Sequence, residues 1–165
     1  MPDRPLRVMA DTNVLISGVI FPRAAYEFLQ HALQGDFTLV LSEQILAEVQ
    51  YWMQTKATHL QRAAMTVFLE EVPCEVVPDP PRAEVERHFQ LVRDSKDVPI
   101  ALAAIQAGVD YLVSHDQDLV AQDETTATLR LWLSPMPVVA FLRDVMGWSP
   151  EELEAIRHRT WEEIG

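Results

Sequence analysis

Short apolar runs that each end in polar residues alternate along this chain with longer segments of helical periodicity. Each of these runs is too short for a buried helix and is typical of a buried strand. The runs are Arg7–Ala10, Phe37–Leu41, Cys74–Pro78, Tyr111–Ser114 and Leu129–Leu133. When strands alternate with helices, the strands usually lie parallel in one sheet. Helices then cover both faces of that sheet. We therefore predict an α/β fold, a three-layer α/β/α sandwich with a mostly parallel central sheet.

The helical segments between these runs carry apolar residues at spacings of three and four. They are predicted at 23–34, 43–54, 59–71, 82–93, 97–107, 137–146 and from 150 onward. Ser42 is a suitable N-cap for the second helix, and Gly35 and Gly108 are suitable stops for two others. Ser149-Pro150-Glu151-Glu152 is a capping box that begins a final helix.

Length and composition favour one soluble domain. The chain has 165 residues with 48% hydrophobic residues, which suffices for a substantial core. Its one cysteine, Cys74, excludes an internal disulfide. The start Met1-Pro2-Asp3-Arg4-Pro5 has no apolar signal core, and no apolar stretch is long enough to span a bilayer, so we expect a cytoplasmic protein without membrane contact. The net charge of −12 argues against general affinity for nucleic acids.

Four acidic residues occupy positions where a core or an element end would usually hold something else. Asp11 and Asp116 each follow a predicted strand, Asp97 opens an alanine-rich helix, and Glu48 lies within the apolar stripe of its helix beside Val49 and Trp52. The carboxyl ends of parallel strands meet at one edge of a sheet, where sites form. Unpaired carboxylates in such positions are costly, and a hard divalent cation such as Mg²⁺ or Mn²⁺ would relieve the cost. The pattern predicts a metal site.

Each acid also has an ordinary structural explanation. Asp11 could belong to a turn or cap a helix, and Asp97 or Asp94 could cap a helix. Asp116 could lie in a loop, and the Glu48 side chain could extend to the surface. Four such exceptions at one sheet edge favour the metal site over these separate explanations. No zinc motif and no glycine-rich phosphate loop accompanies them, and the four tryptophans are interpreted as packing residues.

Several motifs resemble the PIN-domain ribonucleases, especially those that act as toxins of toxin–antitoxin pairs. The first is Asp11-Thr12-Asn13-Val14-Leu15-Ile16-Ser17-Gly18, and the second is Ile45-Leu46-Ala47-Glu48-Val49. The third is Arg93-Asp94-Ser95-Lys96-Asp97 before an alanine-rich helix, and the last is the block from Ala107 to Leu119. The resemblance spans about residues 6 to 142. The chain departs from the family pattern at Val98, where relatives often carry another acid, at His115, and after Arg143.

This resemblance implies that Asp11, Glu48, Asp97 and Asp116 are the catalytic, metal-binding acids. It implies supporting roles for Asn13 and Ser114 and accessory roles for Asp94 and Asp118, and it leaves the choice between Asp94 and Asp97 as the third ligand open, with Asp97 favoured by its place at the helix start. The expected activity is Mg²⁺- or Mn²⁺-dependent hydrolysis of RNA. The expected partners are RNA, a cognate antitoxin and a second copy of the chain in a homodimer.

The expected organisation is a nuclease domain over residues 1–142 and a helical extension over 143–165. The extension, with Leu153, Ile156 and Trp161 along it, either packs on its own core or joins a dimer or antitoxin surface. Two other functions remain open at this point. One is a PIN-like protein that binds RNA or a partner without cutting. The other is a receiver-type phosphoacceptor domain, which would need paired acids before Asp11 and a late lysine, neither of which is present.

Overall fold

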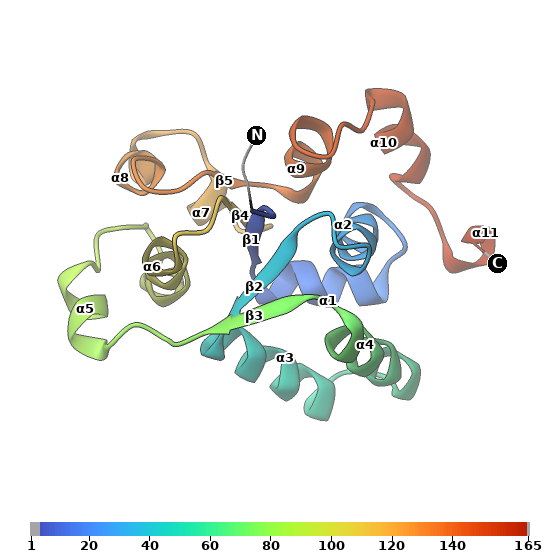
Figure 1. Cartoon of the computed structure of the whole chain (residues 1–165), viewed down its shortest axis with the longest axis horizontal. Coiled ribbons are helices and arrows are strands. Elements are labelled where there is room, and N and C mark those ends of the chain that lie inside the picture. The colour runs from blue at the N-terminus through green and yellow to red at the C-terminus, as the bar shows by residue number, and fades with distance from the viewer. Residues whose placement is uncertain (1–3, 165) are drawn as a thin grey trace.

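A computed structural model describes residues 4–164 and shows a single five-stranded sheet with helices on both faces (Figure 1). The strands are β1 (Arg7–Ala10), β2 (Thr38–Ser42), β3 (Cys74–Val77), β4 (Tyr111–Val113) and β5 (Pro135–Met136). Every strand pair is parallel. The predicted α/β fold with a central parallel sheet is confirmed. Residues 1–3, which belong to the N-terminal segment interpreted above, and Gly165 lie outside the described residues.

The helices connect the strands as the alternation predicts. They are α1 (Thr12–Ile20), α2 (Ala24–Leu33), α3 (Glu43–Thr55), α4 (His59–Glu71), α5 (Arg82–Arg87), α6 (Val98–Ala107), α7 (Gln117–Val120), α8 (Ala127–Arg130), α9 (Val138–Asp144), α10 (Pro150–Ile156) and α11 (Trp161–Ile164). Two short 3-10 turns, Ser95–Asp97 and Glu124–Thr126, precede α6 and α8. None of the helices within residues 4–164 has the length and apolarity that a bilayer crossing requires.

The strand order β3-β2-β1-β4-β5 places β1 at the centre of the sheet. From β1 the chain moves outward to β2 and β3, then crosses back to β4 on the other side of β1. Val8 of β1 is in register with Leu39 of β2 and with Tyr111 of β4. In open parallel sheets, ligand sites form where the strand order reverses in this way, outside the carboxyl ends of the strands. From this topology we expect a ligand site at the carboxyl ends of β1 and β4.

Figure 1 shows α2 and α9 on one side of the β2–β3 ribbon and α3 and α4 on the other. The core on the α2 side is aromatic: Phe28, Phe37 and Phe141 are buried and their ring centroids lie 4.9 to 5.4 Å apart. Helices α1 and α2 approach closely at Gly18, where a Cβ atom would come within 2.8 Å of Leu29 Cγ and 2.9 Å of the Ala25 carbonyl oxygen. The close α1–α2 contact thus requires glycine.

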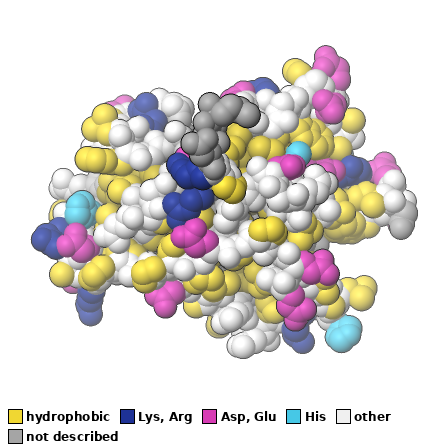
Figure 2. All heavy atoms as spheres, in the orientation of Figure 1, with side chains coloured by type: hydrophobic (Ala, Val, Ile, Leu, Met, Phe, Trp, Pro, Cys, Tyr) yellow, Lys and Arg dark blue, Asp and Glu magenta, His cyan; other side chains and the backbone are white. Residues whose placement is uncertain are grey.

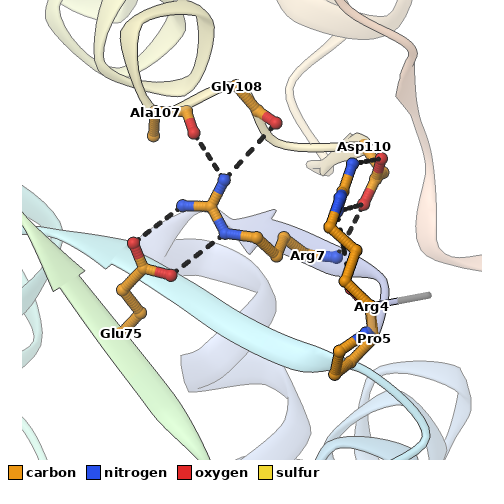
Figure 3. Close-up of polar contacts among 7 residues, drawn as sticks. All are labelled: Arg4, Pro5, Arg7, Glu75, Ala107, Gly108 and Asp110. Atoms are coloured by element: carbon orange, nitrogen blue, oxygen red, sulfur yellow. Dashed lines mark hydrogen bonds and ion pairs between the residues drawn. The ribbon is translucent and has the colours of Figure 1, made fainter. Parts of the chain in front are cut away.

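Charges near the amino ends of the strands are paired with one another (Figure 3). The guanidinium of Arg7 in β1 donates to both carboxylate oxygens of Glu75 in β3, at 3.0 and 2.8 Å, and to the Ala107 carbonyl oxygen at the end of α6, at 2.5 Å. Asp110 accepts from Arg4 and from the Arg7 backbone N–H, at 2.9 and 2.8 Å. The Arg4 hydrogen bond, together with that of Arg7, holds the pKa of Asp110 below its ordinary value despite partial burial. This end of the sheet is closed by matched charges.

Several segments differ from the prediction. Helices α1 and α7 were not predicted, and the predicted final helix from residue 150 onward is two short helices, α10 and α11. The predicted strand Leu129–Leu133 is wrong: α8 covers its first half and the strand lies at Pro135–Met136. Leu129 and Leu133 are buried, whereas Leu131 and Trp132 are 79% and 67% exposed, which is the spacing of a helical turn and not of a strand.

The predicted helix over 82–93 is shorter than expected. It ends at Arg87, with His88 as its C-cap. Phe89, which was predicted to lie on the apolar face of this helix, is 60% exposed. Leu91 and Val92 are buried, but they lie beyond the end of the helix. The apolar residues therefore did not form one helical stripe.

The segment after α9 packs back on α1 and α2. The Arg159 guanidinium donates to the Pro22 carbonyl oxygen at 2.6 Å and pairs with Glu27 at 3.1 Å. The Trp161 indole N–H donates to the Ile20 carbonyl oxygen at 2.9 Å, and its ring packs edge-on against Tyr26 with centroids 5.3 Å apart. The predicted capping box at Ser149 is present at the start of α10.

Candidate metal centre

Asp11 is held at the junction of β1 and α1. The apolar strand buries the backbone up to Ala10, and Asp11 then caps α1, accepting from the Asn13 backbone N–H at 2.8 Å through Oδ1. Its other oxygen accepts from the Ser114 hydroxyl at 2.5 Å. The residue is only 5% exposed, and within residues 4–164 no basic side chain pairs with it. Asp11 thus caps a helix, and it is also a buried carboxylate with no basic side chain paired to it among the described residues.

Ser114 joins the ends of β1 and β4. It is fully buried, donates to Asp11 and accepts from the Asp116 backbone N–H at 2.9 Å. Asp116 in turn caps α7 by accepting from the Asp118 backbone N–H at 2.9 Å. A serine hydroxyl can both donate and accept, which suits it to connect a carboxylate with an N–H group. The supporting position that the resemblance implied for Ser114 therefore has a geometric basis.

Asp97 approaches the same place from the start of α6. It is the N-cap residue by position, but its side chain makes no capping hydrogen bond. Its Oδ2 atom is buried and has no hydrogen-bond partner among the described residues. Burial is the largest cause, and the neighbouring carboxylate of Asp116 the next, of a rise in the pKa of Asp97 to about 8. Asp94 and Asp11 raise it further by their charge. Asp97 is thus a strongly disfavoured anion in the absence of a cation.

Two further acids complete the cluster. Oxygens of Asp94, Asp97 and Asp118 lie within 4.8 Å of one another, as ligands of one ion would. Asp94 caps the turn before α6 by accepting from the Lys96 backbone N–H at 3.0 Å. Asp118 pairs with Arg93 at 2.7 Å. The two residues given accessory roles from the sequence therefore lie as close to Asp97 as a metal site requires. Within residues 4–164 this is the one such group of acidic, histidine or cysteine side chains, and of the four predicted ligands it includes Asp97 alone.

Glu48 lies at the margin of the cluster. It is half-buried on α3 and accepts a hydrogen bond of 3.3 Å from the hydroxyl of Thr12, the residue after Asp11. Its helix continues along a groove of about 410 Å³ to Lys56. Thr12, which links Glu48 to the start of α1, was not singled out from the sequence. Its adjacency to Asp11 was the available signal.

The donor set fits a hard divalent cation. Every candidate ligand is a carboxylate oxygen, and Mg²⁺ and Mn²⁺ prefer such ligands to nitrogen or sulfur. Two carboxylates about 4 Å apart repel by roughly 4 kcal/mol near a protein surface, so the group is unstable as a set of free anions. The unpartnered Asp97 Oδ2 is the atom that a cation would satisfy. On the face seen in Figure 2, Lys and Arg side chains form small separated groups among acidic ones.

The profile of one family, described as PIN domain, matches residues 7–118 and so covers β1 to β4 and the acids described above. Comparison with curated proteins finds no match.

Three crystal structures share the fold at low sequence identity. PAE2754 from Pyrobaculum aerophilum is 18% identical with a TM-score of 0.58, over 87% of this chain and 91% of that one. VapBC2 from Rickettsia felis, bound to a DNA fragment from their promoter, is 19% identical with a TM-score of 0.56; the match covers 80% of this chain and 98% of that one. FitAcB from Neisseria gonorrhoeae is 15% identical with a TM-score of 0.51; the match covers 80% of this chain and 98% of that one.

Proposed function

This chain belongs to the PIN-domain family, and from its acidic cluster we propose that it is a metal-dependent endoribonuclease. The observation that carries the proposal is the buried, unpartnered Oδ2 of Asp97 beside Asp116 and Asp11. A protein that needed these residues only for folding would have paired or capped that atom. The receiver-type alternative is set aside by the family.

We assign Asp11, Asp97 and Asp116 as the principal ligands of Mg²⁺ or Mn²⁺. Asp94 and Asp118 are accessory ligands, and Glu48 acts at the margin through water. When bound, the ion supplies charge stabilisation for phosphodiester hydrolysis and lowers the pKa of a water molecule that attacks in line. No side-chain nucleophile is required.

The protein residues have separate tasks in this proposal. Ser114 and the Asn13 backbone N–H fix the two oxygens of Asp11, so the carboxylate keeps one orientation. A bound cation would favour the ionised form of Asp97, because its positive charge would offset the burial and the neighbouring carboxylates that raise the pKa of Asp97. Arg93, which is exposed and paired with Asp118, would supply a positive charge at the outer edge of the cluster for a substrate phosphate.

We further propose that the chain is the toxin of a toxin–antitoxin pair. The motifs quoted for the sequence support this, and so does the shared fold with VapBC2 and FitAcB. Residues 143–165 act as a helical extension of the same domain, which the contacts of Arg159 and Trp161 with the α1–α2 region support. A non-cutting RNA-binding protein remains the competing function, and one experiment separates the two.

Purified protein is incubated with single-stranded RNA and Mn²⁺, and cleavage is followed by gel. Asp11→Asn should abolish cleavage and weaken Mn²⁺ binding in calorimetry while leaving the circular dichroism spectrum unchanged. Glu70→Gln, which removes one charge from the exposed face of α4, is the matched control and should behave as wild type. Cleavage by Asp11→Asn at the wild-type rate would refute the assignment. Binding of RNA without cleavage by the wild type would favour the non-catalytic function.

A further inference from the structure

A cavity of about 420 Å³ lies where the helical extension packs on the rest of the domain. Residues at the start of α2, on α9 and on α10 line it, and its apolar part includes Val139, Pro150, Leu153 and Ile156. Mostly apolar cavities of this size are typical sites for small molecules. None of the lining residues belongs to the acidic cluster, and most lie beyond the residues 7–118 that the PIN-domain profile matches. This cavity is therefore separate from the candidate metal centre.

Arginines gather at this cavity, which we call the arginine cavity. Arg23, Arg143 and Arg157 line it together with a single acid, Glu154. The whole chain, in contrast, has 25 acidic residues against 13 lysines and arginines. Asp144 pairs with Arg143 at 2.8 Å, and Glu154 lies 3.7 Å from Arg157. Both pairs are exposed, and exposed pairs are weak, so the cavity offers positive charge to a ligand.

Arg23 has hydrogen-bonding capacity that the fold does not use. Its Nε donates to the Arg159 carbonyl oxygen at 3.3 Å, and its guanidinium carbon lies 4.9 Å from the centre of the Phe21 ring. Within residues 4–164 no carboxylate pairs with it, and its two terminal nitrogens make no hydrogen bond. An arginine carries five N–H donors in a planar fork that matches a carboxylate. The half-buried guanidinium is thus held in place with its terminal donors free.

A second apolar cavity shows why this charge matters. It has nearly the same volume, about 390 Å³, and lies between α1, α2 and α4, with Val67 and Phe68 in its lining. Among the described residues that line it there is no basic side chain, but there is an acid, Glu71. Opposite charges attract and like charges repel, so an anion favours the arginine cavity over this one.

We propose that the arginine cavity binds a small amphipathic carboxylate, with its carboxylate at Arg23 and its aliphatic part against Val139 and Leu153. A bidentate, charge-assisted pair with the guanidinium orients the ligand. Contact with the apolar lining adds affinity for each methylene group that leaves water. Such a ligand contacts α2, α9 and α10 together, and so it holds α10 on the rest of the domain. The inference goes beyond the proposed nuclease function and does not depend on it.

Calorimetric titration of the full chain with straight-chain acids tests the proposal. The affinity should rise about two- to fourfold for each methylene from butanoate to octanoate. Octanamide has the same chain without the charge, and acetate has the charge almost without a chain. Both should bind at least about tenfold more weakly than octanoate. Octyl phosphate should bind no more tightly than octanoate, and a clear preference for it would assign the cavity to a phosphate and overturn the proposal.

Variants separate the two parts of the ligand. Arg23→Gln should weaken octanoate binding about 10- to 100-fold, the loss expected for hydrogen bonds to a charged group, and keep the dependence on chain length. Val139→Ser, at a side chain that is 46% exposed, should reduce the gain per methylene and leave acetate binding unchanged. Arg82→Gln is the matched control, because it removes the same charge from a 94% exposed side chain on α5, far from α10 (Figure 1). Val67→Ser alters the second cavity, and both it and Arg82→Gln should bind as wild type.

Amide hydrogen exchange locates the bound acid. Octanoate should slow exchange in α10 and leave α4 unchanged, whereas slowing in α4 alone would place the acid in the second cavity and overturn the proposal. Equal losses of affinity in Arg23→Gln and Arg82→Gln would show a general charge effect and also overturn it.

Three further results would overturn the proposal. The first is the absence of octanoate binding below the concentration at which octanoate forms micelles. The second is tighter binding of an acetylated Leu-Glu peptide than of octanoate, which would assign the cavity to an acidic segment of a partner protein. The third is a dimer that Arg23→Gln converts to a monomer in light scattering, which would make the cavity a subunit contact. None of these results bears on whether the protein cleaves RNA.

Discussion

Replacement of Asp97 by Asn should stabilise the metal-free protein while removing its affinity for the cation. The pKa of Asp97 is about 8 in the folded chain against an ordinary value of 3.8. The folded state therefore binds this proton more tightly than the unfolded state does. The resulting stabilisation is complete below pH 4 and is lost as the pH rises through 8. Asparagine carries no charge and does not incur that loss.

The size of the effect follows from the same pKa. One pKa unit corresponds to about 1.4 kcal/mol, so an unscreened shift would amount to about 5 kcal/mol near pH 8. Asp97 is half-buried, however, and water screens part of the repulsion, so we expect a gain on the order of 1 to 2 kcal/mol. No side-chain cap is lost, because Asp97 makes none.

The assay is urea unfolding of wild type and Asp97→Asn at pH 5, 6.5 and 8, with EDTA and then with Mn²⁺. With EDTA, the advantage of the variant should grow with pH. With Mn²⁺, the wild type should gain stability and the variant should not. Glu70→Gln should match the wild type at every pH and should gain the same stability with Mn²⁺. A variant that is less stable than wild type at pH 8 with EDTA, or an advantage that shrinks as the pH rises, would refute the reasoning.

Three further predictions concern packing and support. Gly18→Ala should destabilise the fold by about 1 to 2 kcal/mol in urea unfolding, because overpacking against Leu29 outweighs the better helix propensity of alanine; an equally stable variant would contradict the close α1–α2 contact. Ser114→Ala should cost about 1 to 3 kcal/mol and lower kcat, since it removes a donor to Asp11 and leaves an N–H group unpaired; unchanged kcat would argue against its positioning role. Trp161→Ala should speed tryptic cleavage within residues 157–159 without changing the unfolding midpoint by more than about 2 °C, because it releases only the terminal segment; an unchanged cleavage rate would show that the indole does not hold that segment.

The strands at the centre of the sheet were predictable because parallel strands buried on both faces give continuous apolar runs. Val8, Met9 and Ala10 of β1 are all fully buried, and the polar residues after them mark the strand end. The α1 helix was not predicted, because it too is a largely apolar run. It is apolar and β-branched over much of its length, with Val14, Leu15 and Val19 buried, so it lacks the clear polar face that identifies a helix.

The candidate site was predictable only in part. That Asp11 and Asp116 lie near each other follows from parallel strands ending at one edge, a rule that needs only the order of elements. The position of Asp94 and Asp118 beside Asp97 depends on how the turn before α6 meets α7, which no periodicity specifies. The contact of Glu48 with Thr12 likewise needs the packing of α1 on α3, and α1 was not predicted.

The hydrogen bond from Ser114 to Asp11 joins residues 103 positions apart in the chain. Bringing such distant segments together costs about 4 kcal/mol of chain entropy, which the pairing of β1 with β4 must overcome. During synthesis, the first half of the polypeptide contains β1 to β3 but has no Ser114, Asp116 or Asp118 to complete the acidic cluster. The acidic cluster therefore cannot be complete until the chain has been synthesised beyond Asp118.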